Sequence, residues 1–165
     1  MGIEFEKQNE LDSELFQAFA EQDSDLAKIA DLITAGANID AENEEGDTIL
    51  MLACDACQTE EDLDKVKLIL ELGADINYEK DGLNCLFDAY RTWVPELVEL
   101  LLRSGADPNC YSTNGDGALL DWVANDLWMY KDKNMAQGGP LTKIYQMLKE
   151  FDAKTSRELA EIKGP

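Results

Sequence analysis

Apolar residues recur at helical spacing in several stretches of the chain, and three of these stretches end in the same kind of segment. Within the stretches, apolar positions fall three and four residues apart, which predicts amphipathic helices. Paired aliphatic residues then precede residues 36–40, 73–77 and 105–109, whose sequences are Gly-Ala-Asn-Ile-Asp, Gly-Ala-Asp-Ile-Asn and Gly-Ala-Asp-Pro-Asn. Because a glycine after a helix can adopt a positive φ, and Asn or Asp favours a turn, each segment predicts a helix stop followed by a loop.

The spacing of these segments indicates an internal repeat. Gly36 and Gly73 are 37 residues apart, and Gly73 and Gly105 are 32 residues apart. A period of about 33 residues is typical of stacked helix-turn-helix repeats. We therefore predict an all-α fold, a solenoid of stacked helix-turn-helix repeats joined by short hairpin loops.

The repeats are expected to form one domain, residues 1–165, because chains of this length commonly fold as a single domain. Residues 1–12 are polar and are expected to lead into a first helix that begins near Ser13. The predicted repeats lie at about 13–39, 40–76, 77–108 and 109–153, followed by a C-terminal cap at 154–165.

Helix boundaries can be predicted in the first two repeats. In the first, Asp23 or Ser24 is expected to cap the second helix. In the second, Thr48 is expected to cap a helix over residues 48–54, and a second helix is expected over residues 63–72. The connection between these two helices is about four residues longer than a repeat of this kind requires, which accounts for the wider spacing.

The third repeat is predicted to have a first helix over residues 82–90 and a second that begins near Pro95, since the first helical turn does not need the missing N–H of proline. In the fourth repeat, the first helix is expected to continue through Trp128 and Tyr130. The remaining predicted segments are a polar, Gly-rich loop at 131–140, a helix at 141–150 and a last inner helix at 155–162.

These motifs resemble the ankyrin-repeat family over roughly residues 13–162. The family pattern is Gly-x-Thr-Pro-Leu-His-x-Ala, followed by Leu-Leu-x-x-Gly-Ala-Asp-x-Asn, and the second part recurs three times here. Residues 48–51, 84–87 and 117–120 are assigned to the Thr-Pro-Leu-His place, and every copy lacks both Pro and His. The residues expected to replace the hydrogen bonds of the family's Thr-His pair by apolar packing are Met51, Phe87 and Leu120.

The charge balance is unusual. The chain has 35 acidic and 14 basic residues, a net charge of −21, and no histidine. Such a chain is expected to avoid nucleic acid and anionic membranes and to attract basic proteins. Solubility is the alternative explanation of the acidity.

The location of the protein is predicted from what the sequence lacks. No apolar run approaches the ~18 residues that a membrane span needs. The N-terminal residues carry neither the basic start nor the apolar stretch of a secretory signal. We expect a cytoplasmic protein, a monomer when free, whose four cysteines stay reduced.

No residue pattern indicates catalysis. Without histidine there is no Ser-His or Cys-His pair and no histidine metal ligand. Cys54 and Cys57 form a CxxC motif, but no βαβ pattern lies nearby, which favours packed thiols over a redox centre. The acidic residues at 42–47 lack the ligand order of an EF-hand loop. We therefore expect no enzyme activity, no cofactor and no metal site.

The resemblance implies a protein-binding surface on one concave side, formed by hairpin loops and the exposed face of the inner helices. Residues 40–81 contain 14 acids and 3 bases, a local balance of −11, so this surface should attract a cationic partner. The residues predicted to contact a partner are Glu42, Glu44, Glu45, Asp47, Asp55, Glu79, Lys80, Leu83, Asp88, Arg91, Tyr111, Asn114, Asp116, Asp121, Asn125, Trp128 and Tyr130.

Aromatic residues concentrate in the C-terminal half, where they could anchor a partner. Trp122 is expected to fill space beside the insertion in the fourth repeat. For Trp128 and Tyr130, which lie past the repeat's own helix, packing and contact roles remain open. The insertion itself, about residues 124–140, favours a functional role because long insertions are uncommon in compact domains.

Three functions are consistent with these features. The first is a binding module that docks a basic protein, in a sharper version an inhibitor or immunity protein that neutralises a cationic toxin. The second is a nucleic-acid mimic that blocks a DNA- or RNA-binding protein. The third is a general scaffold or adaptor of the ankyrin type. An enzyme of unknown type is a further alternative, against which the residues above argue. None of the three requires direct contact with nucleic acid or membrane.

Overall fold

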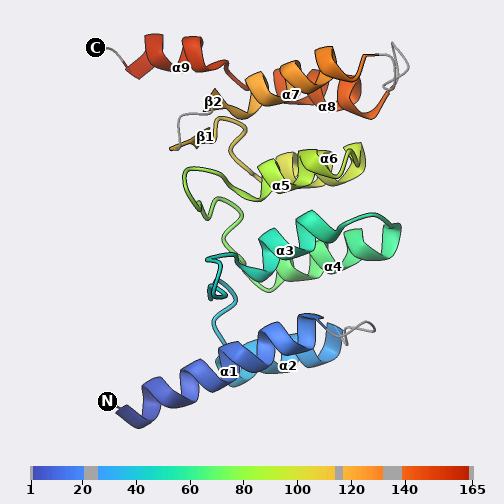
Figure 1. The fold of residues 1–165 in the computed structure, drawn as a ribbon. Coiled ribbons are helices and arrows are strands. Elements are labelled where there is room, and N and C mark those ends of the chain that lie inside the picture. The colour runs from blue at the N-terminus through green and yellow to red at the C-terminus, as the bar shows by residue number, and fades with distance from the viewer. Residues whose placement is uncertain (1, 21–25, 114–116, 132–138, 164–165) are drawn as a thin grey trace. The chain divides into compact units, whose positions relative to one another are not determined.

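The computed structural model describes residues 2–20, 26–113, 117–131 and 139–163 (Figure 1). The chain divides into an N-terminal unit, residues 1–53 with 59–75, and a C-terminal unit, residues 54–58 with 76–165. Helices form almost all of the regular structure in the described ranges, which confirms the all-α class. The single domain and its repeat bounds stay predictions. The predicted caps Asp23 and Ser24 lie outside the described residues.

The N-terminal unit begins with the helix pair α1 (Gly2–Ala20) and α2 (Leu26–Ala35), which pack against each other. Leu15 and Ala18 from α1 are buried, as are Ile29 and Leu32 from α2. The prediction of a lead-in over residues 1–12 is wrong, because α1 already includes these residues from Gly2 onward. The segment has no proline, and its three Glu residues, with one each of Gln, Lys and Leu, favour helix even where no apolar face is present.

The second helix pair contains α3 (Ile49–Ala56) and α4 (Glu60–Glu71). Thr48 precedes α3, as predicted, and its hydroxyl accepts a hydrogen bond from the N–H of Met51 at 3.4 Å. The helix α4 begins three residues earlier than predicted. Thr59 caps it in a capping box, in which Asp62 N–H donates to the Thr59 hydroxyl and Thr59 N–H donates to Asp62. The extra residues of this repeat thus form an additional helical turn.

In the C-terminal unit, α5 (Cys85–Arg91) packs on α6 (Pro95–Arg103). Asn84 caps α5 by accepting a hydrogen bond from Leu86 N–H at 3.1 Å. Pro95 occupies the first turn of α6, which confirms the predicted start. The inner stripe of α6 is buried, with Leu97, Val98 and Leu101 each 0% exposed.

The last repeat adds a short hairpin before its helices. The strands β1 (Tyr111–Ser112) and β2 (Gly117–Ala118) pair antiparallel, with Tyr111 opposite Ala118. The helix α7 (Leu119–Met129) continues past Trp128, as predicted, and ends at Met129, with Tyr130 as its C-cap. It packs on α8 (Pro140–Glu150), which also packs on α6, and α9 (Ser156–Lys163) follows as the predicted last helix.

The start of α7 corrects the predicted register of the fourth repeat. The position capped by Thr48 and Asn84 in the preceding repeats is occupied by Ala118, because Gly117 still belongs to β2. Counted from Ala118, the His place falls on Asp121 rather than on Leu120, which is buried instead. The expected apolar substitution therefore does not apply to this repeat.

Asp121 uses this position to hold α9. Its carboxylate Oδ2 accepts hydrogen bonds from the N–H of Ser156, at 2.8 Å, and from the Ser156 hydroxyl. The Ser156 Oγ in turn accepts from Ala118 N–H at 2.9 Å. A carboxylate thus joins the first turn of α7 to the cap helix, the kind of link that the family's histidine was expected to provide.

The three Gly-Ala-Asx-x-Asx segments end helices as predicted. Gly36, Gly73 and Gly105 have φ of 109°, 99° and 100°, and the preceding helices end at Ala35, Glu71 and Arg103. In each segment the residue after the glycine donates its N–H to a carbonyl five residues back, for example Ala106 to Leu101 at 3.0 Å. This geometry satisfies carbonyls that the helix end would otherwise leave without a partner.

The last Asx of each segment has a second role, which is to join successive loops. In the N-terminal unit, Asp75 N–H donates to Oδ1 of Asp40 at 2.8 Å. In the C-terminal unit, Asp107 N–H donates to Oδ1 of Asn77 at 2.7 Å, and Lys154 N–H donates to Oδ1 of Asn109 at 2.9 Å. The repeated Asx therefore has a structural cause, since each loop supplies an acceptor to the next.

Candidate protein-binding surface

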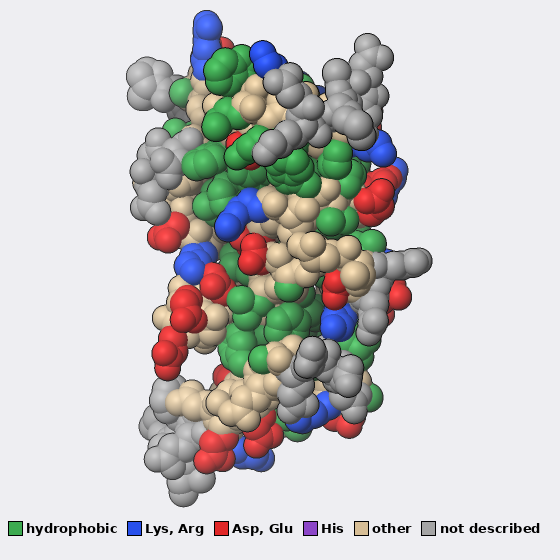
Figure 2. All heavy atoms as spheres, turned by 45° about the vertical axis from the view of Figure 1, so that its right-hand side comes forward, with side chains coloured by type: hydrophobic (Ala, Val, Ile, Leu, Met, Phe, Trp, Pro, Cys, Tyr) green, Lys and Arg blue, Asp and Glu red, His purple; other side chains and the backbone are tan. Residues whose placement is uncertain are grey.

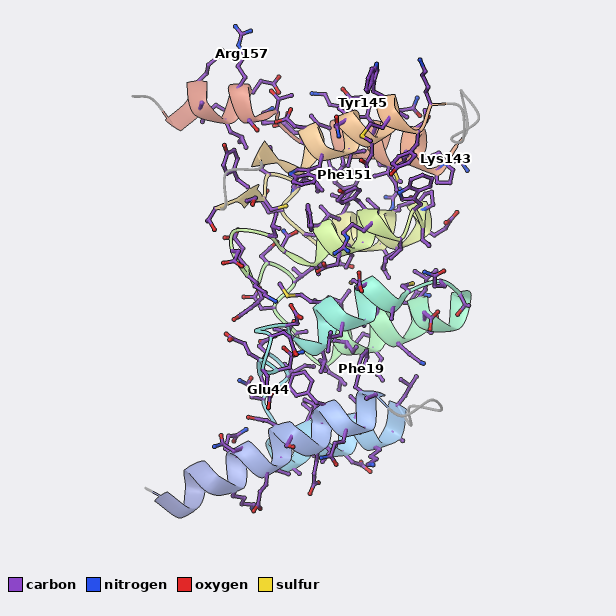
Figure 3. The ribbon with its side chains drawn as sticks, in the orientation of Figure 1. Phe19, Glu44, Lys143, Tyr145, Phe151 and Arg157 are labelled. Carbon is purple, nitrogen blue, oxygen red and sulfur yellow. The ribbon has the colours of Figure 1, made fainter. Side chains whose placement is uncertain are left out.

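The acidic loop of the N-terminal unit is ordered by one asparagine. The side-chain oxygen of Asn43 accepts hydrogen bonds from the N–H groups of Glu45 and Asp47 at 3.0 and 2.8 Å. Glu44 extends from this loop (Figure 3). Glu42, Glu44 and Glu45 are exposed and Asp47 is half-buried, so the predicted residues of this loop lie at the surface.

The two hairpins of the C-terminal unit lie against each other. Tyr111 N–H donates to the Gly82 carbonyl at 3.0 Å, and Thr113 N–H donates to the Asp81 carbonyl at 2.8 Å. Gly82 has φ of 78°, and a Cβ added there would lie 2.1 Å from the Tyr111 carbonyl oxygen. Only glycine therefore permits this backbone approach.

The predicted hairpin residues are brought together by this contact. Lys80 and Leu83 exchange backbone hydrogen bonds, each of 2.9 Å, and are half-buried, while Glu79 is exposed. Tyr111 is 39% exposed on β1. The predicted residues Asn114 and Asp116 lie outside the described residues.

The inner helices position the remaining predicted residues differently. Arg91 on α5 lies 4.0 Å from Asp55, measured from Nη1 to Oδ1, so these two form an exposed ion pair. Asn125 is exposed on α7, and Asp88 is half-buried on α5. The Asp121 carboxylate accepts hydrogen bonds from Ser156, as described above. Two of the residues predicted to contact a partner, Asp55 and Arg91, therefore form an ion pair with each other.

An aromatic cluster links the first helices of two neighbouring repeats. The rings of Phe87 and Trp122 stand edge to face with centroids 5.7 Å apart, and Phe87 and Tyr90 do so at 5.2 Å. Trp93 and Tyr130 form a third such pair at 5.3 Å. The sequence predicted packing for Phe87 and placed Trp93 among the aromatic residues that could anchor a partner. It could not predict that Phe87 pairs with Trp122 or Trp93 with Tyr130, because the two members of each pair are more than 30 positions apart.

The environment of Trp122 agrees with the predicted space-filling role, whereas Trp128 is 72% exposed. Trp122 is half-buried, and its indole Nε1 is buried without a hydrogen-bond partner in the described structure. Met129 beside Trp128 is 57% exposed. The last turn of α7 therefore exposes two large apolar side chains.

The helix pairs that end in Gly-Ala-Asx segments match a known family of repeats. A family model of three ankyrin repeats matches residues 15–112. The chain belongs to the ankyrin-repeat family. Ankyrin repeats are protein–protein interaction modules and are generally not catalytic.

Two curated proteins share these ankyrin repeats. The chain is 33% identical over 90 residues to the ankyrin repeat, SAM and basic leucine zipper domain-containing protein 1 of Mus musculus. The matched stretch covers 52% of this chain and 18% of the mouse protein. It is 42% identical over 57 residues to the 2-5A-dependent ribonuclease of Homo sapiens. This second matched stretch covers 33% of the chain and 8% of the human protein. The chain therefore spans less than a fifth of the length of either relative.

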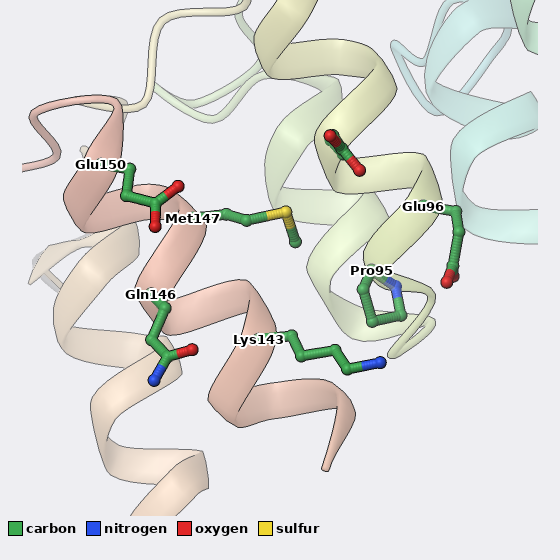
Figure 4. A pocket seen from close by; sticks show the side chains of 7 residues that line it. Pro95, Glu96, Lys143, Gln146, Met147 and Glu150 are labelled. Carbon is green, nitrogen blue, oxygen red and sulfur yellow. The ribbon is translucent and has the colours of Figure 1, made fainter. Parts of the chain in front are cut away.

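A groove between two outer helices of the ankyrin repeats was not predicted. It has a volume of about 330 Å³ and lies between α6 and α8 (Figure 4). Lys143 extends from α8 towards Pro95 at the start of α6, and Met147 extends from α8 towards α6. Its other lining residues are Glu96, Glu99, Gln146 and Glu150. Two helices from different repeats form it, which no local pattern in the sequence could indicate.

The cysteines do not form a reactive site in the described structure. All four are buried, and none of them forms a disulfide bond. Burial raises the pKa of Cys110 to about 12, and a hydrogen bond with Cys85, together with burial, raises the pKa of Cys54 well above its usual value. Thiols of this kind contain little thiolate at neutral pH, so they are poor nucleophiles and poor metal ligands.

Within the described ranges, no group of three or more cysteine or carboxylate side chains is arranged to hold a metal ion. The same part of the chain has no helix with the length and apolar character to cross a membrane.

Proposed function

We propose that this ankyrin-repeat chain docks a basic protein through its acidic hairpins and the exposed face of its inner helices. The observation that carries the proposal is the charge of residues 40–81, which include 14 acidic and 3 basic residues. Exposed Glu42, Glu44 and Glu45 contribute to this excess from one ordered loop. An anionic surface of this kind accelerates encounter with a cationic partner, and the effect weakens as salt screens it.

Charge supplies rate and specificity, whereas affinity comes mainly from buried aromatic anchors. On the face drawn in Figure 2, acidic side chains are interspersed with basic ones rather than forming one uninterrupted patch. Apolar side chains lie between them. A partner would therefore combine cationic groups, which meet the acidic loops, with contacts to apolar and aromatic side chains.

The sharper form of the proposal is an inhibitor, such as an immunity protein that masks a cationic toxin in the cytoplasm. The protein would act as a monomer and without a cofactor. A nucleic-acid mimic that occupies a DNA- or RNA-binding site is the alternative, and a general ankyrin scaffold or adaptor is the least specific form. The ribonuclease activity named for the human relative is not transferred, because the match covers 8% of that protein.

The test begins with proteins captured from the source cells on the immobilised chain at low and high salt. Each captured basic protein is then purified and its affinity is measured. The triple variant Glu42→Gln, Glu44→Gln and Glu45→Gln is expected to bind at least about tenfold more weakly at low salt, because it removes three surface charges. The matched control is Glu10→Gln, Glu14→Gln and Glu71→Gln, which changes the net charge equally at exposed positions elsewhere.

Capture of no basic protein, or binding that is indifferent to salt and to the loop charges, would contradict the proposal. Competition by duplex DNA for the partner would favour the nucleic-acid mimic. Protection of a toxin's target in the presence of the chain would support the inhibitor over the adaptor.

A further inference from the structure

One side of α7 carries three large polar or aromatic residues in line. Trp122, Asp126 and Tyr130 are four residues apart, which places them on one face of the helix. Tyr130 is the C-cap, and its N–H donates to the Asp126 carbonyl at 2.8 Å. The line therefore runs along α7 with Asp126 between two aromatic residues.

The neighbouring repeat supplies rings beside both ends of this line. Phe87 contacts Trp122 at a centroid distance of 5.7 Å, and Trp93 contacts Tyr130 at 5.3 Å. Trp93 has φ of 58°, a conformation unusual for a tryptophan, and its N–H donates to the Tyr90 carbonyl at 3.1 Å. We call Trp93, Trp122, Asp126 and Tyr130 the α7 strip.

Asp126 is a carboxylate in the middle of the α7 strip. It is half-buried, and no lysine or arginine forms an ion pair with it within the described ranges. Arg91, on the adjacent helix, pairs with Asp55 instead. Burial raises the pKa of Asp126, and its charge contributes, after burial, to raising the pKa of Tyr90 to about 12. A partly desolvated charge without a partner is unfavourable, and a cation would relieve it.

We propose that the α7 strip binds an arginine side chain of a partner protein, with the guanidinium at Asp126 and its flat face or aliphatic stem against the rings. The inference rests on the proposed function and identifies the group that the basic partner inserts. Arginine fits better than lysine because its planar guanidinium forms two parallel hydrogen bonds with a carboxylate and stacks on aromatic rings.

The direct test is a titration of the full chain with the blocked tripeptide acetyl-Gly-Arg-Gly-amide, followed by NMR. The chain has three tryptophans, so three indole N–H signals report on it. Trp128 lies two positions from Asp126, on another side of α7, and serves as the internal control. The Trp93 signal is expected to shift and the Trp128 signal to stay in place.

Two matched comparisons isolate the charge. The isosteric citrulline tripeptide, which is neutral, is expected to bind roughly tenfold more weakly than the arginine peptide. The variant Asp126→Asn is expected to lose a similar factor, whereas Asp31→Asn, at an exposed position of α2, is expected to change nothing. Tyr130→Leu, which keeps an apolar side chain but removes the ring, should weaken binding about threefold.

Several results would overturn the inference: equal shifts with citrulline, binding unaffected by Asp126→Asn, or shifts confined to residues 42–47. Concentration-dependent shifts of Trp93 without peptide would assign the strip to a second copy of the chain instead. If a basic protein binds the Asp126→Asn variant normally but not the triple loop variant, this inference fails while the proposed function stands. If no basic protein binds the unaltered chain, the proposed function fails.

Discussion

Two loop junctions of the same design differ by one functional group. In the N-terminal unit, the Asp40 carboxylate accepts the N–H of Asp75 at 2.8 Å. In the C-terminal unit, the Asn77 amide accepts the N–H of Asp107 at 2.7 Å and also donates its Nδ2 to the Gly105 carbonyl at 3.1 Å. A carboxylate has no hydrogen to donate, so Asp40 cannot make the second bond.

The difference shows how charge and stability compete in this chain. Asp40 belongs to the most acidic part of the sequence, where it adds to the charge that we propose attracts a partner. Its junction forms one side-chain bond fewer than the neutral junction at Asn77. Exchanging the two groups separates the electrostatic role of the acid from the structural role of the loop.

The largest loss of stability is expected at Gly82, where the two hairpins of the C-terminal unit are closely packed. The variant Gly82→Ala should destabilise the C-terminal unit by at least about 3 kcal/mol, because the added Cβ meets a carbonyl oxygen and φ is positive. The clash distance is 2.1 Å. Urea unfolding would measure the loss. Gly36→Ala is the comparison variant, since Gly36 also has a positive φ but nothing lies within 4 Å of the added Cβ. Equal losses in the two variants would mean that the hairpin contact contributes nothing.

The variant Asn77→Asp converts the second junction into the first. It should cost about 1–2 kcal/mol, because the bond to the Gly105 carbonyl is lost and a carboxylate then faces that oxygen. The free energy of unfolding at pH 7 measures the change. The loss should shrink at low pH, where the new carboxyl is protonated and can donate again. A loss that is independent of pH would contradict this explanation.

The reverse variant, Asp40→Asn, should stabilise the N-terminal unit by about 0.5–1 kcal/mol, because the new amide can donate to the Gly73 carbonyl. The similar φ of Gly73 and Gly105, 99° and 100°, indicates that the two carbonyls are presented alike. Thermal unfolding measures the gain. Asp40→Ser, which keeps an acceptor without the amide, is the control and should not show the gain.

The smallest effect concerns another carboxylate that accepts hydrogen bonds, Glu158 in α9. Hydrogen bonds from Thr155 N–H, at 2.7 Å, and from its hydroxyl lower the pKa of this carboxyl below its ordinary value of 4.5. A lowered folded-state pKa contributes stability above that range, which is lost as the pH falls through the folded value. We expect the melting temperature of Glu158→Gln to lie slightly below that of the unaltered chain at pH 7 and to match it at pH 3. A difference that persists at pH 3 would contradict the role of the charge.

Local features of the sequence predicted the helix stops and several starts. Gly36, Gly73 and Gly105 end helices because the residue type itself permits positive φ. Thr48 and Pro95 mark helix starts because capping and the missing N–H are local properties. The acidic loop at 42–47 was also predicted, since charge and turn residues lie together in the chain.

Features that depend on neighbours in space were missed or misplaced. The His place of the fourth repeat was assigned to Leu120, although Asp121 occupies it and binds Ser156, 35 positions away. The additional turn of α4 was missed because the capping box of Thr59 and Asp62 was not recognised. The ring pair of Trp93 and Tyr130 could not be predicted from spacing, because it forms only when two repeats pack.

The sequence alone therefore determined the repeat, the all-α class, the helix ends and the acidity, since each depends on residue type within a few positions. The tertiary structure decided which polar side chains are already engaged and which remain available. Asp121 and Asp126 are five positions apart on one helix, yet the first holds α9 and the second has no ion-pair partner among the described residues. That difference arises from what packs beside each carboxylate, which the order of residues along the chain does not contain.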